Sequence, residues 1–309
     1  MALPAQNTGT ARRGNRAGGD MELISWNIQW GRGADGRVDL ARTVRTLHAI
    51  ADADVICLQE VTRGYSELAG EPGSDQVAEL TALLPGYRIL YAPAVDRFTM
   101  DGAPRQFGNL MATRLPLLEV FRHALPWPAD PTVPSMPRVA LEATVMAGER
   151  RLRVICTHLE YYSTHQRAAQ TDALRAWHRE ACEHASQPGL RESGPGPFTP
   201  EARPASAVLC GDFNGAPDDI AYLRMLAPYD GCHETGIIGW HDAWTHTHPG
   251  KPHAPTCALY DREQWPQAPF ACDFAFLTED LLPRVLCCEV DGETRASDHQ
   301  PIYLSLADE

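Results

Sequence analysis

The chain has no long apolar run and relatively few basic residues. No stretch reaches the about 18 consecutive apolar residues that a membrane-spanning helix needs, so no membrane span is expected. Lys and Arg total 27 against 40 Asp and Glu, which gives a net charge of −13 at pH 7. Such a surface repels polyanions on average. Stable binding to duplex nucleic acid is therefore not expected, although a surface with an overall acidic charge can still contain a local basic groove.

The nine cysteines lack the spacing of a disulfide framework or of a zinc site. Several lie inside apolar, strand-like runs, among them Cys57 in Val-Ile-Cys-Leu and Cys156 in Val-Ile-Cys-Thr. We interpret them as small core residues of a protein from a reducing compartment, and we expect a cytoplasmic location.

Residues 1–20 are small, polar and basic and lack the apolar centre of a secretory signal. They predict a disordered N-terminal tail. Met21 directly precedes the first strand-like run and is a candidate for the native start, which N-terminal sequencing of the native protein would test. Because no internal repeat and no shift of composition marks a boundary, residues 21–309 are expected to form a single domain.

Short apolar runs alternate with amphipathic stretches along the rest of the chain, as in an α/β protein. Apolar residues recur at helical spacing over residues 40–47 and again over residues 164–184. Another helix is expected to begin near Pro217, and the Pro-, Gly- and Ser-rich stretch 186–206 predicts a surface loop. Strands are expected at residues 22–26, 54–61, 87–91, 108–116, 139–145, 152–159, 208–212, 272–277 and 301–306.

Polar or ionisable side chains lie directly beside the ends of five of these apolar runs. They are Asn27, Glu60, His158, Asp212 with Asn214, and Asp298 with His299. One such residue is ordinary turn chemistry, whereas five suggest strand ends that meet at one site. Oxygen ligands from Glu60, Asp298 and the Asn27 amide suit Mg²⁺ or Mn²⁺, which keep bound waters and accept a substrate phosphate. Imidazoles and amides would stabilise the negative oxygens of an in-line transition state, so the residues fit hydrolysis of a phosphate ester.

A series of short motifs resembles the signature of the endonuclease/exonuclease/phosphatase family and extends from about residue 22 to residue 306. The motifs are Ser25-Trp-Asn27, Leu58-Gln-Glu60-Val61, Gly108-Asn109 with Thr113-Arg114-Leu-Pro116, Thr157-His158-Leu159, Gly211-Asp212-Phe-Asn214, Asp273-Phe-Ala-Phe276 and Ser297-Asp298-His299-Gln-Pro301. The resemblance implies a four-layer α/β sandwich of the DNase I-like kind, in which two mixed β-sheets pack face to face with helices outside.

The resemblance also implies how the metal and the attacking water are held. Asn27 and Glu60 would bind or position a Mg²⁺ or Mn²⁺ ion, and Asp298 would complete its coordination. Asp212 would orient and deprotonate the water that attacks phosphorus.

The remaining matching residues would contact the phosphate. Asn214 would donate to the phosphate oxygens, and His158 would contact them opposite His299. Asp273 would orient His299, because a carboxylate beside an imidazole raises its pKa and fixes its tautomer. The chain departs from the family pattern at Cys272, where relatives often carry a larger or basic residue.

The Thr157-His158-Leu159 motif resembles the histidine branch of the family, which includes neutral sphingomyelinases, inositol-polyphosphate phosphatases, deadenylases and tyrosyl-DNA phosphodiesterases. The loop over residues 27–33 is similar to that of small bacterial metal-dependent hydrolases of the family. The expected function is a monomeric phosphodiesterase or phosphatase for a small or single-stranded substrate. Two alternatives stay open: a DNA-repair nuclease of the exonuclease III type, and a catalytically silent binding module on the same fold.

Simpler interpretations also stay open for single residues. Asn27 or Asn214 taken alone is more often a turn or helix cap than a ligand. Glu60 could form a buried salt bridge to an arginine such as Arg63. Trp244 is expected to pack and to offer a shelf for the substrate.

Further charged and aromatic candidates are left outside the core site. Arg32 and Arg114 could contact phosphate. The remaining histidines lie among Pro, Gly and Thr without a paired-ligand spacing, so a solvated loop at the rim of the site is favoured over a zinc site. They are His241, His246, His248 and His253.

Overall fold

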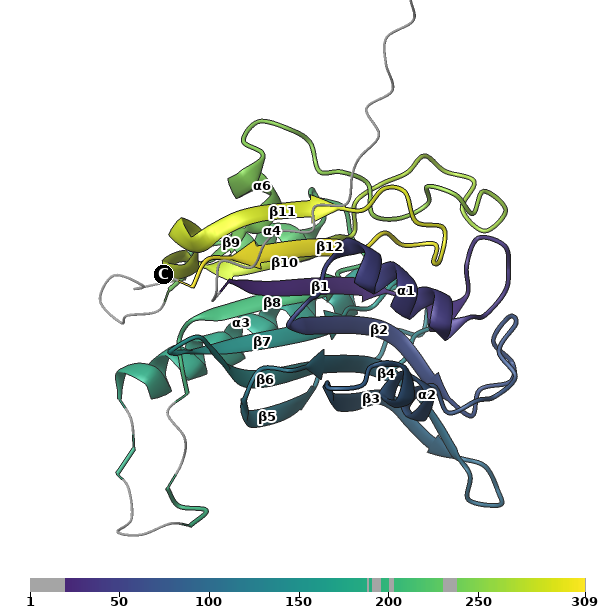
Figure 1. The fold of residues 1–309 in the computed structure, drawn as a ribbon, viewed down its shortest axis with the longest axis horizontal. Helices are drawn as coiled ribbons and strands as arrows, with labels where there is room; N and C mark the ends of the chain where they lie inside the picture. Colours follow the sequence, from purple (N-terminus) through teal and green to yellow (C-terminus); the bar gives the residue numbers. More distant parts are fainter. Residues whose placement is uncertain (1–19, 188, 191–195, 200–202, 230–237, 309) are drawn as a thin grey trace, which may run out of the picture.

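Two β-sheets lie face to face in the computed structural model, with helices on their outer faces (Figure 1). The structure describes residues 20–187, 189–190, 196–199, 203–229 and 238–308, and within these ranges each sheet has six strands. The expected four-layer α/β sandwich of two mixed sheets is therefore confirmed. The predicted N-terminal tail lies outside the described residues, apart from Asp20.

The first sheet has the strand order β11-β12-β1-β2-β4-β3. β1 and β2 pair in parallel, and the other neighbours are antiparallel. The strands are β1 (Met21–Asn27), β2 (Val55–Arg63), β3 (Arg88–Phe98), β4 (Pro104–Thr113), β11 (Val285–Val290) and β12 (Ile302–Leu306).

The second sheet has the order β5-β6-β7-β8-β10-β9 and repeats this plan, because it also has one parallel pair, β7 with β8, among antiparallel neighbours. The strands are β5 (Leu117–Ala124), β6 (Val139–Ala147), β7 (Arg150–His158), β8 (Ala207–Asp212), β9 (Trp240–Asp242) and β10 (Asp273–Thr278).

Helices cover both sheets. They are α1 (Leu40–Ile50), α2 (Gln76–Leu83), α3 (Thr164–Ser186), α4 (Ile220–Leu226) and α6 (Ala243–Thr247), with short 3₁₀ turns η1 (Gln29–Gly31) and η2 (Glu279–Arg284). Aspartate or serine side chains cap their first turns: Asp39 accepts from the backbone N–H of Arg42, and Ser163 from that of Gln166. None of the helices in the described ranges has the length and apolar character needed to cross a bilayer.

Three apolar layers hold the sandwich together. Buried side chains from both sheets, such as Leu23 and Val154, fill the space between them. Leu47 of α1 packs with the outer side of the first sheet, and Leu174 of α3 packs with the outer side of the second. Full burial of one such side chain contributes about 1.5–3 kcal/mol, so these layers supply the main drive for folding.

All nine predicted strands have counterparts in the structure, whereas β5, β9 and β11 were not predicted. Each of these three lies at an edge of its sheet. An edge strand is partly exposed and lacks the continuous apolar run that marks a covered strand. The half-exposed pattern of β5 illustrates this, because only intermediate and exposed side chains occur along it.

The strand directions bring the predicted site residues to one edge of the sandwich. Asn27 ends β1 and pairs with Gln59 on the parallel strand β2. His158 ends β7 and pairs with Asp212 at the end of β8, which in turn pairs with Asp273 at the start of β10. Because β1 contacts β8 and β2 contacts β7 across the interior, the strand ends of both sheets meet.

Candidate active site

The amide of Asn27 connects the two sheets at their common edge. Its nitrogen Nδ2 lies 3.3 Å from Glu60 Oε1 and 3.0 Å from Asp212 Oδ2, and it donates to both. Its oxygen Oδ1 accepts from the backbone N–H of Gln29 at 3.1 Å. One buried amide therefore holds a carboxylate from each sheet in the same place.

Glu60 owes its direction to an irregularity in β2. The register between β2 and β4 shifts between Leu58 and Val61, and Glu60 has a positive φ of 62°. A bulge with a left-handed residue turns a side chain away from the regular pleat, and such strain is typical of functional sites. The alternative salt bridge to Arg63 is absent from the described contacts, because that guanidinium donates to Asp75 and Gln106.

His299 is held between two carboxylates. Its Nδ1 lies 2.8 Å from Asp273 Oδ2, and its Nε2 lies 3.8 Å from Asp212 Oδ2. Burial alone lowers the pKa of His299, but Asp273 and other negative neighbours outweigh burial and raise that pKa well above its usual value. These neighbours therefore favour the protonated form of the imidazole.

His158 has the opposite electrostatic environment. Its Nε2 lies 3.5 Å from Asp212 Oδ2 and 4.0 Å from Glu60 Oε1. Burial, together with the positive charges of Arg138 and His299, lowers the pKa of His158 well below its usual value. Two imidazoles whose pKa values are shifted in opposite directions thus flank the same aspartate.

Asp212 and Asn214 form one compact turn after β8. The backbone N–H of Asn214 donates to Asp212 Oδ1 at 2.8 Å, and the side-chain amide donates to the carbonyl of Leu159 at 3.0 Å. Asn214 adopts a positive φ of 50°. Gly211 must be glycine, because its φ is 143° and a Cβ there would clash with the carbonyl of Thr157.

Asp298 lies next to this group and is oriented by a loop that the sequence did not identify. Its Oδ2 accepts from Gln264 Nε2 at 3.0 Å and from Trp265 Nε1 at 2.9 Å. Ser297 donates to the carbonyl of Asn27 at 2.7 Å and so joins this segment to the end of β1.

The carboxylates repel one another where they converge. Burial and the charge of Asp298 raise the pKa of Glu60 to about 7. Burial and the charge of Asp273 raise the pKa of Asp212 to about 6. A divalent cation would relieve this repulsion, and the carboxylate oxygens of Glu60 and Asp298 are the donors that Mg²⁺ or Mn²⁺ prefers. Asn27 positions Glu60 through its Nδ2, while its Oδ1 accepts from Gln29. The residues present therefore fit such an ion.

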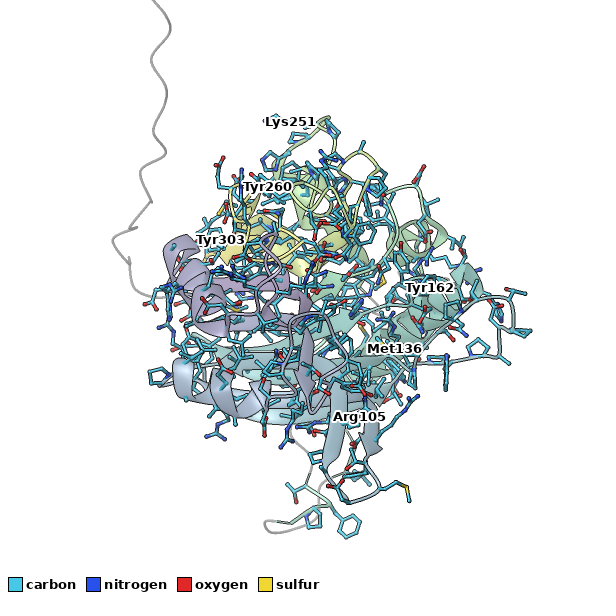
Figure 2. The ribbon with its side chains drawn as sticks, turned by 90° about the vertical axis from the view of Figure 1, so that its right-hand side faces the viewer. Arg105, Met136, Tyr162, Lys251, Tyr260 and Tyr303 are labelled. Carbon is cyan, nitrogen blue, oxygen red and sulfur yellow. The ribbon has the colours of Figure 1, made fainter. Side chains whose placement is uncertain are left out.

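A cavity of about 560 Å³ opens over these residues and has aromatic walls. Met136 and Tyr162 border it and lie close together on the face shown in Figure 2. Tyr161 packs edge-on against Tyr162 with ring centroids 4.7 Å apart, and against Trp265 at 6.1 Å. Sequence reasoning missed these rings, although Tyr161 and Tyr162 follow the Thr-His-Leu-Glu segment directly.

The other candidates lie outside this cavity. Trp244 stacks on His248 with centroids 3.9 Å apart and does not line the cavity, so the expected substrate shelf is wrong. His253 contacts Asp242, and Arg114 contacts Asp52 and Asp54.

Arg32 approaches the rim of the cavity without lining it. It pairs with Asp261 at 3.2 Å and donates to Gln264, which does line the cavity. The eight cysteines within the described residues are free.

Several solved structures share this fold. An endonuclease/exonuclease/phosphatase from Beutenbergia cavernae DSM 12333 matches with 23% identity and a TM-score of 0.63, over 94% of this chain and 72% of that one. Truncated TDP2 from Caenorhabditis elegans matches with 16% identity and a TM-score of 0.61, over 93% and 97%. A mannosyl-6-phosphatase from Bacteroides thetaiotaomicron matches with 15% identity and a TM-score of 0.59, over 92% and 98%.

No curated protein matches this sequence. The model of the endonuclease/exonuclease/phosphatase family, however, matches residues 24–299, which include every predicted site residue. The match spans most of the chain and agrees with the two mixed sheets and with the solved structures. The chain belongs to the endonuclease/exonuclease/phosphatase family.

Proposed function

We propose that this chain is a Mg²⁺- or Mn²⁺-dependent phosphodiesterase that cleaves a phosphate ester by in-line attack of water. The observation that carries the proposal is the meeting of Glu60 and Asp212, from the two sheets, at the amide of Asn27, with His299 beside Asp212. Members of the family act on phosphate esters, and TDP2 and the mannosyl-6-phosphatase share the fold.

In this proposal, Glu60, Asp298 and Asn27 hold or position the ion. The ion would supply Lewis-acid polarisation of the phosphate and of the attacking water. Asn27 keeps the Glu60 and Asp212 carboxylates at a fixed separation through its Nδ2. Gln264 and Trp265 fix Asp298 by donating to its Oδ2. Such supporting hydrogen bonds keep a ligand in its productive orientation.

Asp212 is the proposed general base. Its pKa of about 6 lies close to neutral pH, where a base is most effective because it is ionised and still accepts a proton readily. Asn27 and Asn214 fix the carboxylate by donating to Oδ2 and Oδ1 respectively. The proton from the attacking water would move to this carboxylate.

His158, His299 and Asn214 are the proposed phosphate contacts. The protonated His299, oriented by Asp273, supplies a positive charge where negative charge develops on the phosphate oxygens. His158 is neutral and contacts the phosphate through a ring N–H. Asn214 would offer the second N–H of its side-chain amide, which donates its other N–H to the Leu159 carbonyl.

The aromatic cavity supports a substrate that carries an organic group beside the phosphate. Its volume of about 560 Å³ exceeds what a bare phosphate fills, and Tyr161, Tyr162 and Trp265 offer flat apolar surfaces. We propose a small or single-stranded phosphodiester, acted on by a monomer. Free thiols support a cytoplasmic location.

The test is a substrate panel with the metal varied. Purified protein stripped of metal is given an aryl phosphodiester, an aryl phosphomonoester, short single-stranded oligonucleotides and duplex DNA, each with Mg²⁺, Mn²⁺ or chelator. We expect metal-dependent hydrolysis, fastest with the diester. Activity undiminished by chelator, or metal binding without turnover on any ester, would overturn the proposal. Preference for duplex DNA with a steep salt dependence would favour the repair-nuclease alternative.

A further inference from the structure

Two buried cysteines flank His299. Three possible ligand atoms lie within 4.8 Å of one another: the sulfur of Cys257, the sulfur of Cys272 and a ring nitrogen of His299. The Cys272 sulfur lies 4.0 Å from His299 Nδ1 and 3.5 Å from Asp273 Oδ2. The exposed fractions are 0% for Cys257, 1% for Cys272 and 5% for His299. All three nevertheless border the cavity, so a small ion has a path to them.

Backbone pairing fixes the three segments that carry these side chains. Cys257 forms isolated antiparallel bridges with both Phe270 and His299. Its N–H donates to the Phe270 carbonyl at 3.0 Å. The N–H of Cys272 donates to Thr256 Oγ1 at 3.1 Å. The possible ligand atoms are therefore held together by contacts that need no metal, and little chain ordering remains when an ion binds.

We propose that Cys257, Cys272 and His299 bind a thiophilic divalent cation of the zinc class, at a site separate from the Mg²⁺ or Mn²⁺ position, and that its binding inhibits hydrolysis. Two thiolates and an imidazole are typical ligands of Zn²⁺, whereas Mg²⁺ and Mn²⁺ prefer oxygen. Binding removes one proton from each thiol and one from Nδ1 of His299, and the three protons pass to solvent. Asp273 or water supplies the fourth ligand of a tetrahedral ion.

Inhibition follows from the position of His299, and this half of the proposal rests on the proposed function. His299 Nδ1 now bonds to Asp273 Oδ2 at 2.8 Å. An ion bound at Nδ1 replaces the proton on that nitrogen and breaks this hydrogen bond. Asp273 then no longer holds the ring in the orientation that places Nε2 3.8 Å from Asp212 Oδ2, and the proposed phosphate contact is lost. The predicted absence of a zinc motif is compatible with this site, because backbone pairing, and not sequence spacing, brings the ligands together.

The binding test uses Co²⁺ and Zn²⁺ as probes on the full chain. We expect one equivalent of Co²⁺ to produce thiolate charge-transfer absorption in the wild type and in Cys182→Ala, a matched control in which a buried cysteine of α3 is removed. Cys257→Ala and Cys272→Ala should lose the absorption. Absorption that persists in both variants, or its absence from the wild type, would overturn the proposal.

A second binding measurement needs no variant and so does not depend on how the variants fold. X-ray absorption of the wild type with one equivalent of Zn²⁺ should show two sulfur neighbours at about 2.3 Å. A shell of only nitrogen and oxygen would overturn the site.

The inhibition test compares each variant with its own activity before zinc is added. The zinc concentration that halves Mn²⁺-dependent hydrolysis should rise at least about tenfold in Cys257→Ala and stay unchanged in Cys182→Ala. Equal inhibition of Cys257→Ala and wild type would mean that zinc acts at the Mn²⁺ position, and would overturn the inhibitory role. If the wild type hydrolyses no ester, the proposed function fails, whereas the two binding measurements still decide whether the zinc site exists.

Discussion

Asp273 Oδ2 lies 2.8 Å from His299 Nδ1, and this hydrogen bond joins the first strand position of β10 in one sheet to the segment before β12 in the other. Both side chains are buried, with exposed fractions of 4% and 5%. Asp273 thus fixes the ring so that Nε2 faces Asp212. The orientation of His299, which precedes a strand of one sheet, therefore depends on a carboxylate from the other sheet.

Asp273→Asn should lower kcat on the order of 100-fold, because the amide keeps the size of the side chain but loses the charge that holds His299. KM for a small aryl ester should change much less, since the cavity walls are unaltered. Steady-state kinetics and thermal unfolding are measured on the same preparation. Asp280→Asn, at η2 and away from the cavity, is the matched control. A kcat equal to that of the control would show that His299 does not depend on Asp273.

Glu60→Gln should raise the Mn²⁺ concentration needed for half-maximal activity by about tenfold or more, because a neutral amide binds a hard cation more weakly than a carboxylate does. The metal activation curve measures this directly. Glu67→Gln serves as control, since Glu67 pairs with Arg105 and its side chain is 63% exposed. If both variants have the wild-type activation curve, Glu60 does not hold the ion.

Trp265→Phe removes the N–H that donates to Asp298 Oδ2 while keeping an aromatic wall. The account predicts weaker metal activation, by about tenfold, with little change in KM for aryl esters. Trp244→Phe is the comparison, because Trp244 is outside the cavity and donates to the Pro252 carbonyl. A change in KM alone would mean that Trp265 contacts substrate without supporting Asp298.

The free energy of unfolding should decrease as the pH is lowered, because His178 of α3 is buried as a neutral ring. Its Nδ1 lies 2.7 Å from Arg153 Nη2, and its Nε2 lies 2.8 Å from the Ile238 carbonyl. Burial and the charge of Arg153 lower the pKa of His178 to about 3. The unfolded chain binds a proton near pH 6.5 and the folded chain near pH 3. The contribution of neutral His178 to the free energy of unfolding is therefore complete above pH 6.5 and declines as the pH falls towards 3.

Urea unfolding at pH 7 and pH 5 measures that contribution. The free energy of unfolding of the wild type should fall by about 2 kcal/mol more than that of His178→Gln, since only the wild type carries the depressed histidine. His184→Gln, an exposed position in the same helix, should behave as the wild type does. Identical pH dependence in His178→Gln and wild type would contradict a neutral buried His178.

Much of the candidate site could be predicted because its residues end strands that are covered on both faces. Asn27 follows the apolar run of β1, and Asp212 that of β8, so both pattern and motif identified them. Parallel pairing then places such ends at one edge.

The support of the site could not be predicted in the same way. Gln264 and Trp265 belong to a segment without helix or strand, and their contact with Asp298 depends on a loop path that no periodicity encodes. The approach of Cys257 to His299 likewise depends on one isolated bridge between distant segments. Edge strands such as β5 were missed because their side chains are partly exposed.

The most direct measurement is Mn²⁺-dependent hydrolysis of an aryl phosphodiester by wild type, Asp212→Asn and Asp172→Asn. Asp172 pairs with Arg224 on the surface and does not line the cavity, so Asp172→Asn makes the same chemical change outside the site. The account predicts that Asp212→Asn loses activity by at least about 100-fold, while it still folds and Asp172→Asn keeps the wild-type rate. Equal rates for all three proteins would contradict the assignment of Asp212 as the base that activates water.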